Sequence, residues 1–139
     1  MTRIILHGAN GYMGRVVAEQ AAEDADIKIV AGIDIADDGT HDFAVHTDGA
    51  DCSEDADVVV DFSVAKAVDG LLDFCERRSL PVVLCTTGLS EEQLKRVEAL
   101  SRKVAVLRSA NMSLGVNTLL SLVKKAAASK QSFNRNITG

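Results

Sequence analysis

The chain has 139 residues, of which 47% are hydrophobic and 25% charged, with a formal net charge of −5. This length and composition are typical of one folded domain, and the negative balance argues against binding to nucleic acid or to an anionic membrane surface. No apolar run is long enough to span a bilayer, and the N-terminus reaches Arg3 at once and then only a short apolar strand, so it is not expected to be a signal peptide.

Short apolar runs alternate along the chain with segments of helical periodicity. In chain order we expect a strand over 3–7, a helix over 12–23, strands over 27–34 and 57–62, a helix over 64–75, a strand over 81–85, a helix over 90–100, a strand over 104–108 and a helix over 116–127. Ser63 is expected to cap the helix that follows it, and Ser90 with Gln93 forms a capping box. Strands separated by helices predict an α/β fold with a doubly wound, Rossmann-like parallel sheet.

Two segments depart from this alternation. The stretch 35–56 is acidic and rich in turn residues, with at most a short strand around 43–46. The stretch 129–139 loses the apolar period and is expected to be a polar, frayed C-terminal tail. We therefore expect a single domain over residues 1–128.

The three cysteines, Cys52, Cys75 and Cys85, are odd in number and form no Cys-x-x-Cys motif. We expect small buried hydrophobic side chains there, with no disulfide framework and no metal site. A chain with free thiols fits the reducing cytoplasm, which is the expected location.

The first strand leads into a glycine-rich turn, HGANGYMGRV at residues 7–16. In a βαβ unit the first such glycine allows a tight turn, the second lets a pyrophosphate approach the backbone, and the third lets the helix pack on the sheet. The spacing of Gly8, Gly11 and Gly14 is G-x-x-G-x-x-G rather than the commoner G-x-G-x-x-G. The alternative is a glycine-rich turn that binds nothing, but a strand before it and a helix after it favour dinucleotide binding.

An acidic residue at the end of the second strand supports the same interpretation. Asp34 lies 20 positions beyond Gly14, where an acid commonly binds the adenosine ribose; it can equally serve as a turn residue. No Lys or Arg occurs between residues 29 and 65, so nothing there can pair with a 2′-phosphate. We therefore expect NAD(H) to be preferred over NADP(H). Arg15 is a nearby cation that either binds the pyrophosphate or is only solvated.

Three more small, polar loops follow strands, at 61–63, 85–88 and 109–117. Each loop alone is explained by turn and cap chemistry. Because the carboxyl ends of parallel strands meet at one edge of a sheet, the three together indicate a cleft there.

The motifs GANGYMGR (8–15), DFS (61–63), TTG (86–88) and SANMSLGVN (109–117) together resemble those of the 4-hydroxy-tetrahydrodipicolinate reductase (dihydrodipicolinate reductase) family, over nearly all of residues 2–128. The resemblance implies cofactor-binding roles for Gly8, Ala9, Asn10, Gly11, Tyr12, Met13, Gly14, Asp34, Phe62, Ser63, Thr86, Thr87, Gly88, Ser109, Ala110, Asn111 and Met112. It also places Thr87 and Gly88 close to the substrate. Related reductases often accept both NADH and NADPH, and they reduce a cyclic dicarboxylate, 4-hydroxy-tetrahydrodipicolinate, in lysine and diaminopimelate biosynthesis.

The chain departs from the family in its length. Members are normally about twice as long, with a second domain for substrate binding and tetramerisation that carries paired histidines, a lysine and a Ser-Gly-Thr motif. Here His7, His41 and His46 are unpaired, and no such motif follows. We therefore expect the cofactor-binding half of a homotetrameric reductase, without catalytic residues of its own, that is monomeric or weakly self-associating. The alternatives are half of a homoserine or aspartate dehydrogenase, or a non-catalytic NAD-binding module.

Overall fold

The computed structural model describes residues 1–109, 115–129 and 133–137. In chain order the elements are β1 (Thr2–His7), α1 (Tyr12–Ala22), β2 (Ile27–Ile33), β3 (Ala44–His46), the short 3-10 helix η1 (Gly49–Asp51), β4 (Val58–Asp61), α2 (Ala65–Arg78), β5 (Val82–Leu84), α3 (Glu91–Ser101), β6 (Ala105–Ser109), α4 (Val116–Ala128) and β7 (Phe133–Ile137). Within these described ranges no helix is long and apolar enough to cross a membrane.

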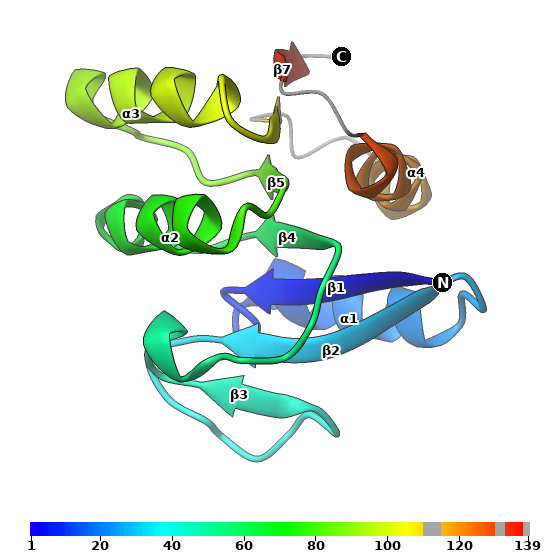
Figure 1. The fold of residues 1–139 in the computed structure, drawn as a ribbon. Helices are drawn as coiled ribbons and strands as arrows, with labels where there is room; N and C mark the ends of the chain where they lie inside the picture. The colour runs from blue at the N-terminus through cyan, green and yellow to red at the C-terminus, as the bar shows by residue number, and fades with distance from the viewer. Residues whose placement is uncertain (110–114, 130–132, 138–139) are drawn as a thin grey trace.

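All the strands run parallel in one sheet with the order β3-β2-β1-β4-β5-β6-β7 (Figure 1). The chain proceeds outward from β1 to β3 and then returns to the other side of β1 with β4. Ligands of open parallel sheets bind at such a reversal, beyond the carboxyl ends of the strands. The predicted Rossmann-like fold is confirmed, and by this rule the ends of β1, β2 and β4 form the candidate functional edge.

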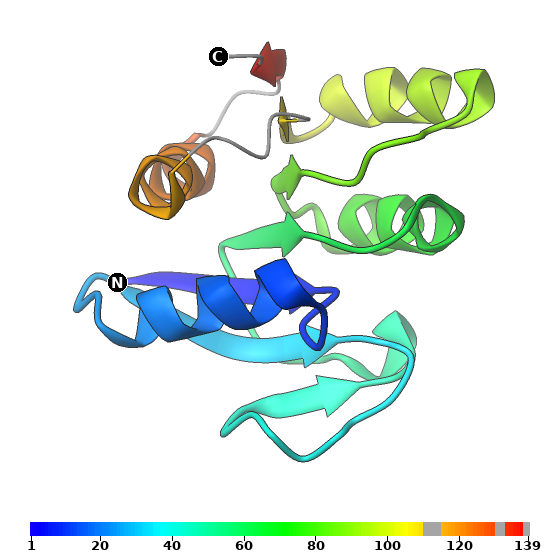
Figure 2. The ribbon, with the colours of Figure 1, turned by 180° about the vertical axis from the view of Figure 1, so that it is seen from behind.

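Helices cover both faces of the sheet, with α2 and α3 on one face and α1 and α4 on the other (Figures 1 and 2). Side chains along β1 alternate between the two cores, because successive residues of a strand point to opposite faces. Ile5 packs in the core that contains Leu71 of α2, whereas Ile4 packs in the core that contains Val17 of α1. The central strands are thus buried on both faces, as their continuous apolar runs predicted.

The C-terminal segment is where the sequence prediction of a frayed tail is wrong. Residues Phe133–Ile137 form β7, which pairs in parallel with β6 in the register Ala105 to Phe133. This segment lacks an apolar run, so its tendency to form a strand comes from pairing with the existing edge of the sheet rather than from its own pattern.

Of the two predicted helix caps, the structure has one and lacks the other. The capping box is confirmed: the hydroxyl of Ser90 accepts a hydrogen bond from the backbone N–H of Gln93, whose side chain accepts one from the backbone of Ser90. Ser63, in contrast, does not cap α2. The N-cap residue is Val64, whose aliphatic side chain cannot accept a hydrogen bond, and the hydroxyl of Ser63 donates to Asp61 instead.

Candidate cofactor-binding site

The glycines of the turn between β1 and α1 have different structural requirements. Gly8 has a φ of +81°, and a Cβ there would lie 2.5 Å from the carbonyl oxygen of Phe62. A Cβ on Gly14 would lie 2.3 Å from the carbonyl oxygen of Gly8. Both positions therefore need glycine for the fold itself.

Gly11 is different, because the protein leaves room for a side chain there. Its backbone is extended, with φ −72° and ψ 170°, and a Cβ at this position would lie 3.6 Å from its nearest neighbour, the carbonyl oxygen of Gly8. It is the N-cap residue of α1 and is exposed, so it lies where free backbone N–H groups and the positive end of the helix dipole face outward. The arrangement fits an anion that approaches the backbone closely.

Asp34 lies against this turn. Its Oδ2 accepts a hydrogen bond from the backbone N–H of Asn10 at 2.8 Å, and its Oδ1 accepts one from the backbone N–H of Ile35 at 2.7 Å. A carboxylate offers about four lone-pair sites, so these two bonds leave acceptor capacity on both oxygens. Asp34 thus organises the turn and can still accept hydrogen bonds from a diol.

The side chain of Asn10 is only partly satisfied. Its Nδ2 donates to the carbonyl oxygen of Ala36 at 2.7 Å, which ties the glycine turn to the loop after β2. Its Oδ1 is buried and has no hydrogen-bond partner among the described residues. Buried polar atoms are normally paired, so this oxygen fits a donor group that a ligand supplies.

A buried carboxylate connects the ends of three strands. Asp61, the last residue of β4, is fully buried and accepts hydrogen bonds from Nδ1 of His7 at 2.7 Å, Oγ of Ser63 at 2.6 Å and Oγ1 of Thr86 at 2.5 Å. Burial alone would raise the pKa of Asp61, but its hydrogen bonds, above all the one with His7, hold that pKa below its usual value. The carboxylate is therefore ionised, and it fixes the loops after β4 and β5.

A cavity of about 1020 Å³ opens at this edge, between the glycine turn, the loop after β3 and helix α2. Its lining includes the predicted residues Gly8, Asn10, Gly11, Asp34, Phe62 and Ser63. Two exposed apolar side chains also line it, Ile35 at 92% and Val64 at 56% exposure, and Tyr12 lies beside the turn at 82%. Large apolar groups gathered at a cavity that also holds polar groups suit the covering of a flat, partly apolar ligand.

The remaining predicted residues that the structure describes lie at the same sheet edge but do not line this cavity. Thr86 is buried after β5, whereas Thr87 and Gly88 are exposed in the loop that follows it. Ser109 is buried at the end of β6. The predictions for Ala110, Asn111 and Met112 fall outside the described residues. In the turn itself Ala9 is buried and Met13 is half-buried.

Sequence reasoning missed the roles of His7 and Asp61. Each is a polar residue in the last position of a strand, directly after three apolar residues, and that is the signal that could have found them. The two residues are directly opposite each other in the β1–β4 register.

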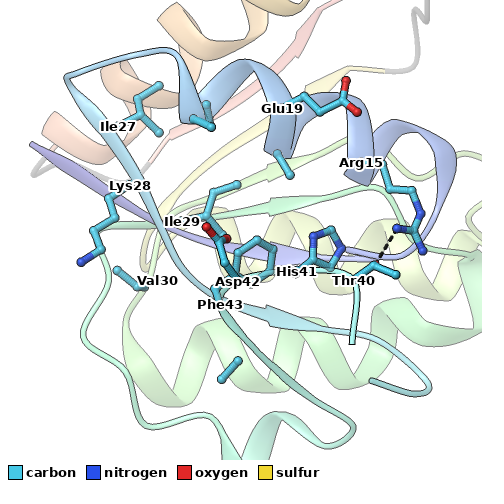
Figure 3. A pocket seen from close by; sticks show the side chains of 14 residues that line it. Arg15, Glu19, Ile27, Lys28, Ile29, Val30, Thr40, His41, Asp42 and Phe43 are labelled. Carbon is cyan, nitrogen blue, oxygen red and sulfur yellow. Dashed lines mark hydrogen bonds between the residues drawn. The ribbon is translucent and has the colours of Figure 1, made fainter. Parts of the chain in front are cut away.

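A second hollow, of about 930 Å³, lies between α1, β2 and the loop before β3 (Figure 3). It is lined by residues 27–30 at the start of β2, away from the carboxyl edge, so it is not part of the candidate site.

Arg15 borders this hollow and donates to the carbonyl oxygen of Asn10 at 3.0 Å and to Oγ1 of Thr40 at 2.7 Å. It also pairs with Asp38, whose pKa is lowered to about 2 by hydrogen bonds from Thr40 and then from Arg15. Arg15 therefore joins α1 to the acidic loop.

A family model described as "Dihydrodipicolinate reductase, N-terminus" matches residues 2–112. The chain belongs to the dihydrodipicolinate reductase family. The 4-hydroxy-tetrahydrodipicolinate reductase of Caldanaerobacter subterraneus subsp. tengcongensis is 48% identical over 137 residues, which are 99% of this chain and 54% of the relative. That of Clostridium tetani is 42% identical over 89% of this chain and 49% of its own length. The chain thus spans about half the length of the curated dihydrodipicolinate reductases that it matches.

Solved structures show the same fold at lower identity. A dipicolinate-bound dihydrodipicolinate reductase from Paenisporosarcina sp. TG-14 superposes with a TM-score of 0.70 at 21% identity, over 80% of this chain and 48% of that one. The WlbA dehydrogenase from Thermus thermophilus, in complex with NAD and UDP-GlcNAcA, gives a TM-score of 0.60 at 21% identity, over 78% of this chain and 41% of that one. At such low sequence identity, these structures show only that this dihydrodipicolinate reductase domain shares the Rossmann-like fold.

Proposed function

We propose that residues 1–139 bind a nicotinamide dinucleotide at the carboxyl edge of the sheet, with the pyrophosphate on the turn between β1 and α1. The observation that carries this proposal is the open backbone at Gly11, where the protein tolerates a side chain but the sequence has none. A pyrophosphate that contacts the backbone N–H groups at the start of α1 supplies the reason.

The adenosine half occupies the cavity between the turn and α2 in this proposal. Asp34 accepts hydrogen bonds from the ribose hydroxyls with the acceptor capacity that Asn10 and Ile35 leave free. The buried Oδ1 of Asn10 gains a partner from the bound cofactor. Ile35 and Val64, exposed in the chain by itself, become covered.

The nicotinamide half lies toward β5 and β6. Ser63 and Thr86 are held by Asp61, so the loops after β4 and β5 present a fixed surface. Thr87 and Gly88 are exposed there and can face both the nicotinamide and the substrate. We extend the same role to Ser109, Ala110, Asn111 and Met112 on the basis of the family resemblance alone.

The proposed preference is for NAD(H) over NADP(H). A 2′-phosphate would lie close to the carboxylate of Asp34, and like charges repel. Lys66 and Arg77 line the cavity from α2, and they offset part of this repulsion. NADP(H) is thus accepted, with lower affinity.

The proposed reaction is the reduction of 4-hydroxy-tetrahydrodipicolinate, a cyclic dicarboxylate, in lysine and diaminopimelate biosynthesis in the cytoplasm. The bound nicotinamide supplies the hydride, and residues 1–139 orient it and shield one side of it. On the family pattern, the groups that clamp the substrate carboxylates and donate the proton belong to the part of the relatives that this chain does not match. Residues 1–139 by themselves are then a cofactor-binding unit, monomeric or weakly self-associating, without turnover.

The test is a calorimetric titration of the chain with NADH, followed by competition with ADP-ribose. ADP-ribose carries the adenosine and the pyrophosphate but lacks the nicotinamide. We expect one equivalent of NADH to bind and ADP-ribose to displace it. The absence of NADH binding would refute the proposal, and binding that ADP-ribose does not affect would refute the placement of the pyrophosphate and adenosine.

A further inference from the structure

We propose that His46, Cys52 and Glu54 form a binding site for a divalent zinc-like cation. The site lies at the carboxyl end of β3, beside the cofactor cavity, but its three residues do not line that cavity. One ligand atom from each residue lies within 4.8 Å of the others, and no other such group of three occurs in the part of the chain that the structure describes. His46 ends β3, Cys52 follows η1, and Glu54 lies in the loop that leads to β4. The spacing of the cysteines alone gave no sign of this site, because two of its three ligands are not cysteines.

The imidazole and carboxylate donors lie near the separation of a metal-bound pair, and the sulfur of Cys52 lies within 4.8 Å of both. Nε2 of His46 lies 2.9 Å from both carboxylate oxygens of Glu54. In a tetrahedral zinc site, bonds of about 2.0 Å to nitrogen and 2.3 Å to sulfur place the donors about 3.3–3.5 Å apart. The side chains of His46 and Glu54 are 22% and 29% exposed, so they can separate slightly to admit the ion. Cys52 is buried beside them and supplies the sulfur.

The backbone that carries two of the ligands is held in place. Arg78 of α2 donates to the carbonyl oxygen of Cys52 at 2.8 Å and to that of Glu54 at 2.7 Å. Its guanidinium also lies over the ring of Phe74, 5.3 Å from the ring centre. A site on fixed backbone loses little conformational freedom when the ion binds.

The charges of the three ligands suit a doubly charged ion. The thiolate of Cys52 and the carboxylate of Glu54 together balance the two positive charges, and neutral His46 adds none. The formed site is therefore neutral and is not opposed by the guanidinium of Arg78. Sulfur, imidazole and carboxylate together favour Zn²⁺ or Co²⁺ over Mg²⁺ or Ca²⁺, which prefer oxygen alone, and three protein ligands leave a fourth position for water.

The test uses the whole chain, with zinc chloride in one titration and cobalt chloride in another, and with no dinucleotide present, so its result is independent of the proposed cofactor function. We expect one equivalent of zinc to bind. We expect the cobalt form to show a thiolate-to-cobalt charge-transfer band and the intense visible bands of tetrahedral cobalt. A cobalt spectrum of octahedral, oxygen-only coordination would overturn the proposal.

Variants of the ligands complete the test. Cys52→Ser and Glu54→Gln should each weaken zinc binding by more than about 100-fold, beyond the usual effect of losing an outer-shell partner. His41→Gln is the matched control, because His41 lies in the preceding loop and contacts the carbonyl oxygen of Ala9 instead; it should bind zinc like the unmodified chain. Circular dichroism checks that each variant is folded. If Cys52→Ser does not fold, Glu54→Gln and His46→Gln decide the question, and zinc affinity unchanged in the folded ligand variants would contradict the site.

Discussion

The imidazole Nδ1 of His7 lies 2.7 Å from Oδ1 of Asp61, and both side chains are buried. The two residues end neighbouring strands, so this contact joins the turn that begins at Gly8 to the loop that contains Ser63. Asp61 also holds Ser63 and Thr86 directly. One buried carboxylate thereby positions three of the loops that the cofactor proposal uses.

We first predict that Asp61→Asn lowers the free energy of unfolding near neutral pH by about 1–3 kcal/mol, because buried donors lose a charged acceptor. The native pKa of Asp61 is below its unfolded value, so its stabilisation is fully present above the unfolded pKa of about 3.9 and is lost as the pH falls through the native pKa. The stability of the variant should therefore fall less steeply in acid. Urea unfolding across this acidic range measures both effects.

Asp57→Asn is the matched control for that experiment. Asp57 directly precedes β4 and pairs with Arg3 near the start of β1, so this ion pair lies at the opposite ends of the two strands from His7 and Asp61. Both side chains of the pair are partly exposed, Asp57 at 30% and Arg3 at 45%. Solvent screening limits such a pair to about 1 kcal/mol or less. If both variants lost equal stability, the buried network around Asp61 would have no special role.

The glycine turn gives a second prediction. Gly11→Val should leave the fold intact, because a Cβ there meets nothing closer than 3.6 Å, but it should abolish NADH binding. Gly14→Ala should instead reduce stability, by about 1–3 kcal/mol, because its Cβ would lie 2.3 Å from a backbone oxygen. Thermal unfolding and calorimetric titration of both variants separate the two effects. NADH affinity that is unchanged in Gly11→Val would exclude pyrophosphate binding at this position.

The third prediction concerns cofactor choice. We expect NADH to bind about tenfold or more tightly than NADPH, since a hydrogen bond to a charged group contributes about 1.5–3 kcal/mol. Asp34→Asn should narrow this ratio by removing the charge that repels a 2′-phosphate. Asp37→Asn serves as the control: it makes the same charge change in the same loop, where Asp37 accepts a bond from Gly39. Equal dissociation constants for both cofactors at one ionic strength would defeat the prediction.

The fourth prediction is that residues 1–139 bind NADH but do not oxidise it when 4-hydroxy-tetrahydrodipicolinate is supplied. Hydride transfer needs the reacting carbons about 3–3.5 Å apart in an aligned pose, and under the proposed function residues 1–139 supply only one side of the cleft that holds them. Loss of a general acid alone costs about 10²–10⁴-fold. A steady-state assay with freshly generated substrate tests this, and turnover at the rate of a full-length family member would place the catalytic groups within this chain.

Patterns local in the sequence predicted most of the fold. Continuous apolar runs identified the central strands, and the spacing of Ser90 and Gln93 identified the start of α3. The strand Phe133–Ile137 escaped prediction because its pairing with β6 is a tertiary effect that its polar residues do not encode. Ser63 was expected to cap a helix, but a buried carboxylate competed for its hydroxyl.

The candidate site was only partly predictable for the same reason. Gly8, Gly11 and Asp34 follow a known spacing, so their neighbourhood could be inferred. His7 and Asp61 are 54 residues apart, and the approach of their side chains depends on the strand order. The cluster of His46, Cys52 and Glu54 likewise depends on how the loop after β3 folds against Arg78.

The interior position of β1 in the sheet also bears on when the candidate cofactor edge forms during folding. β1 leaves the ribosome before β2 and can pair with it across a single helical crossover, but its other neighbour, β4, is much later in the chain. Contacts between residues that are distant in sequence form slowly, because a long loop must be closed first. The bond between His7 and Asp61 therefore belongs to the late steps of folding. A nascent chain that has β1, α1 and β2 holds the glycine turn before it has the network that fixes the loops around it.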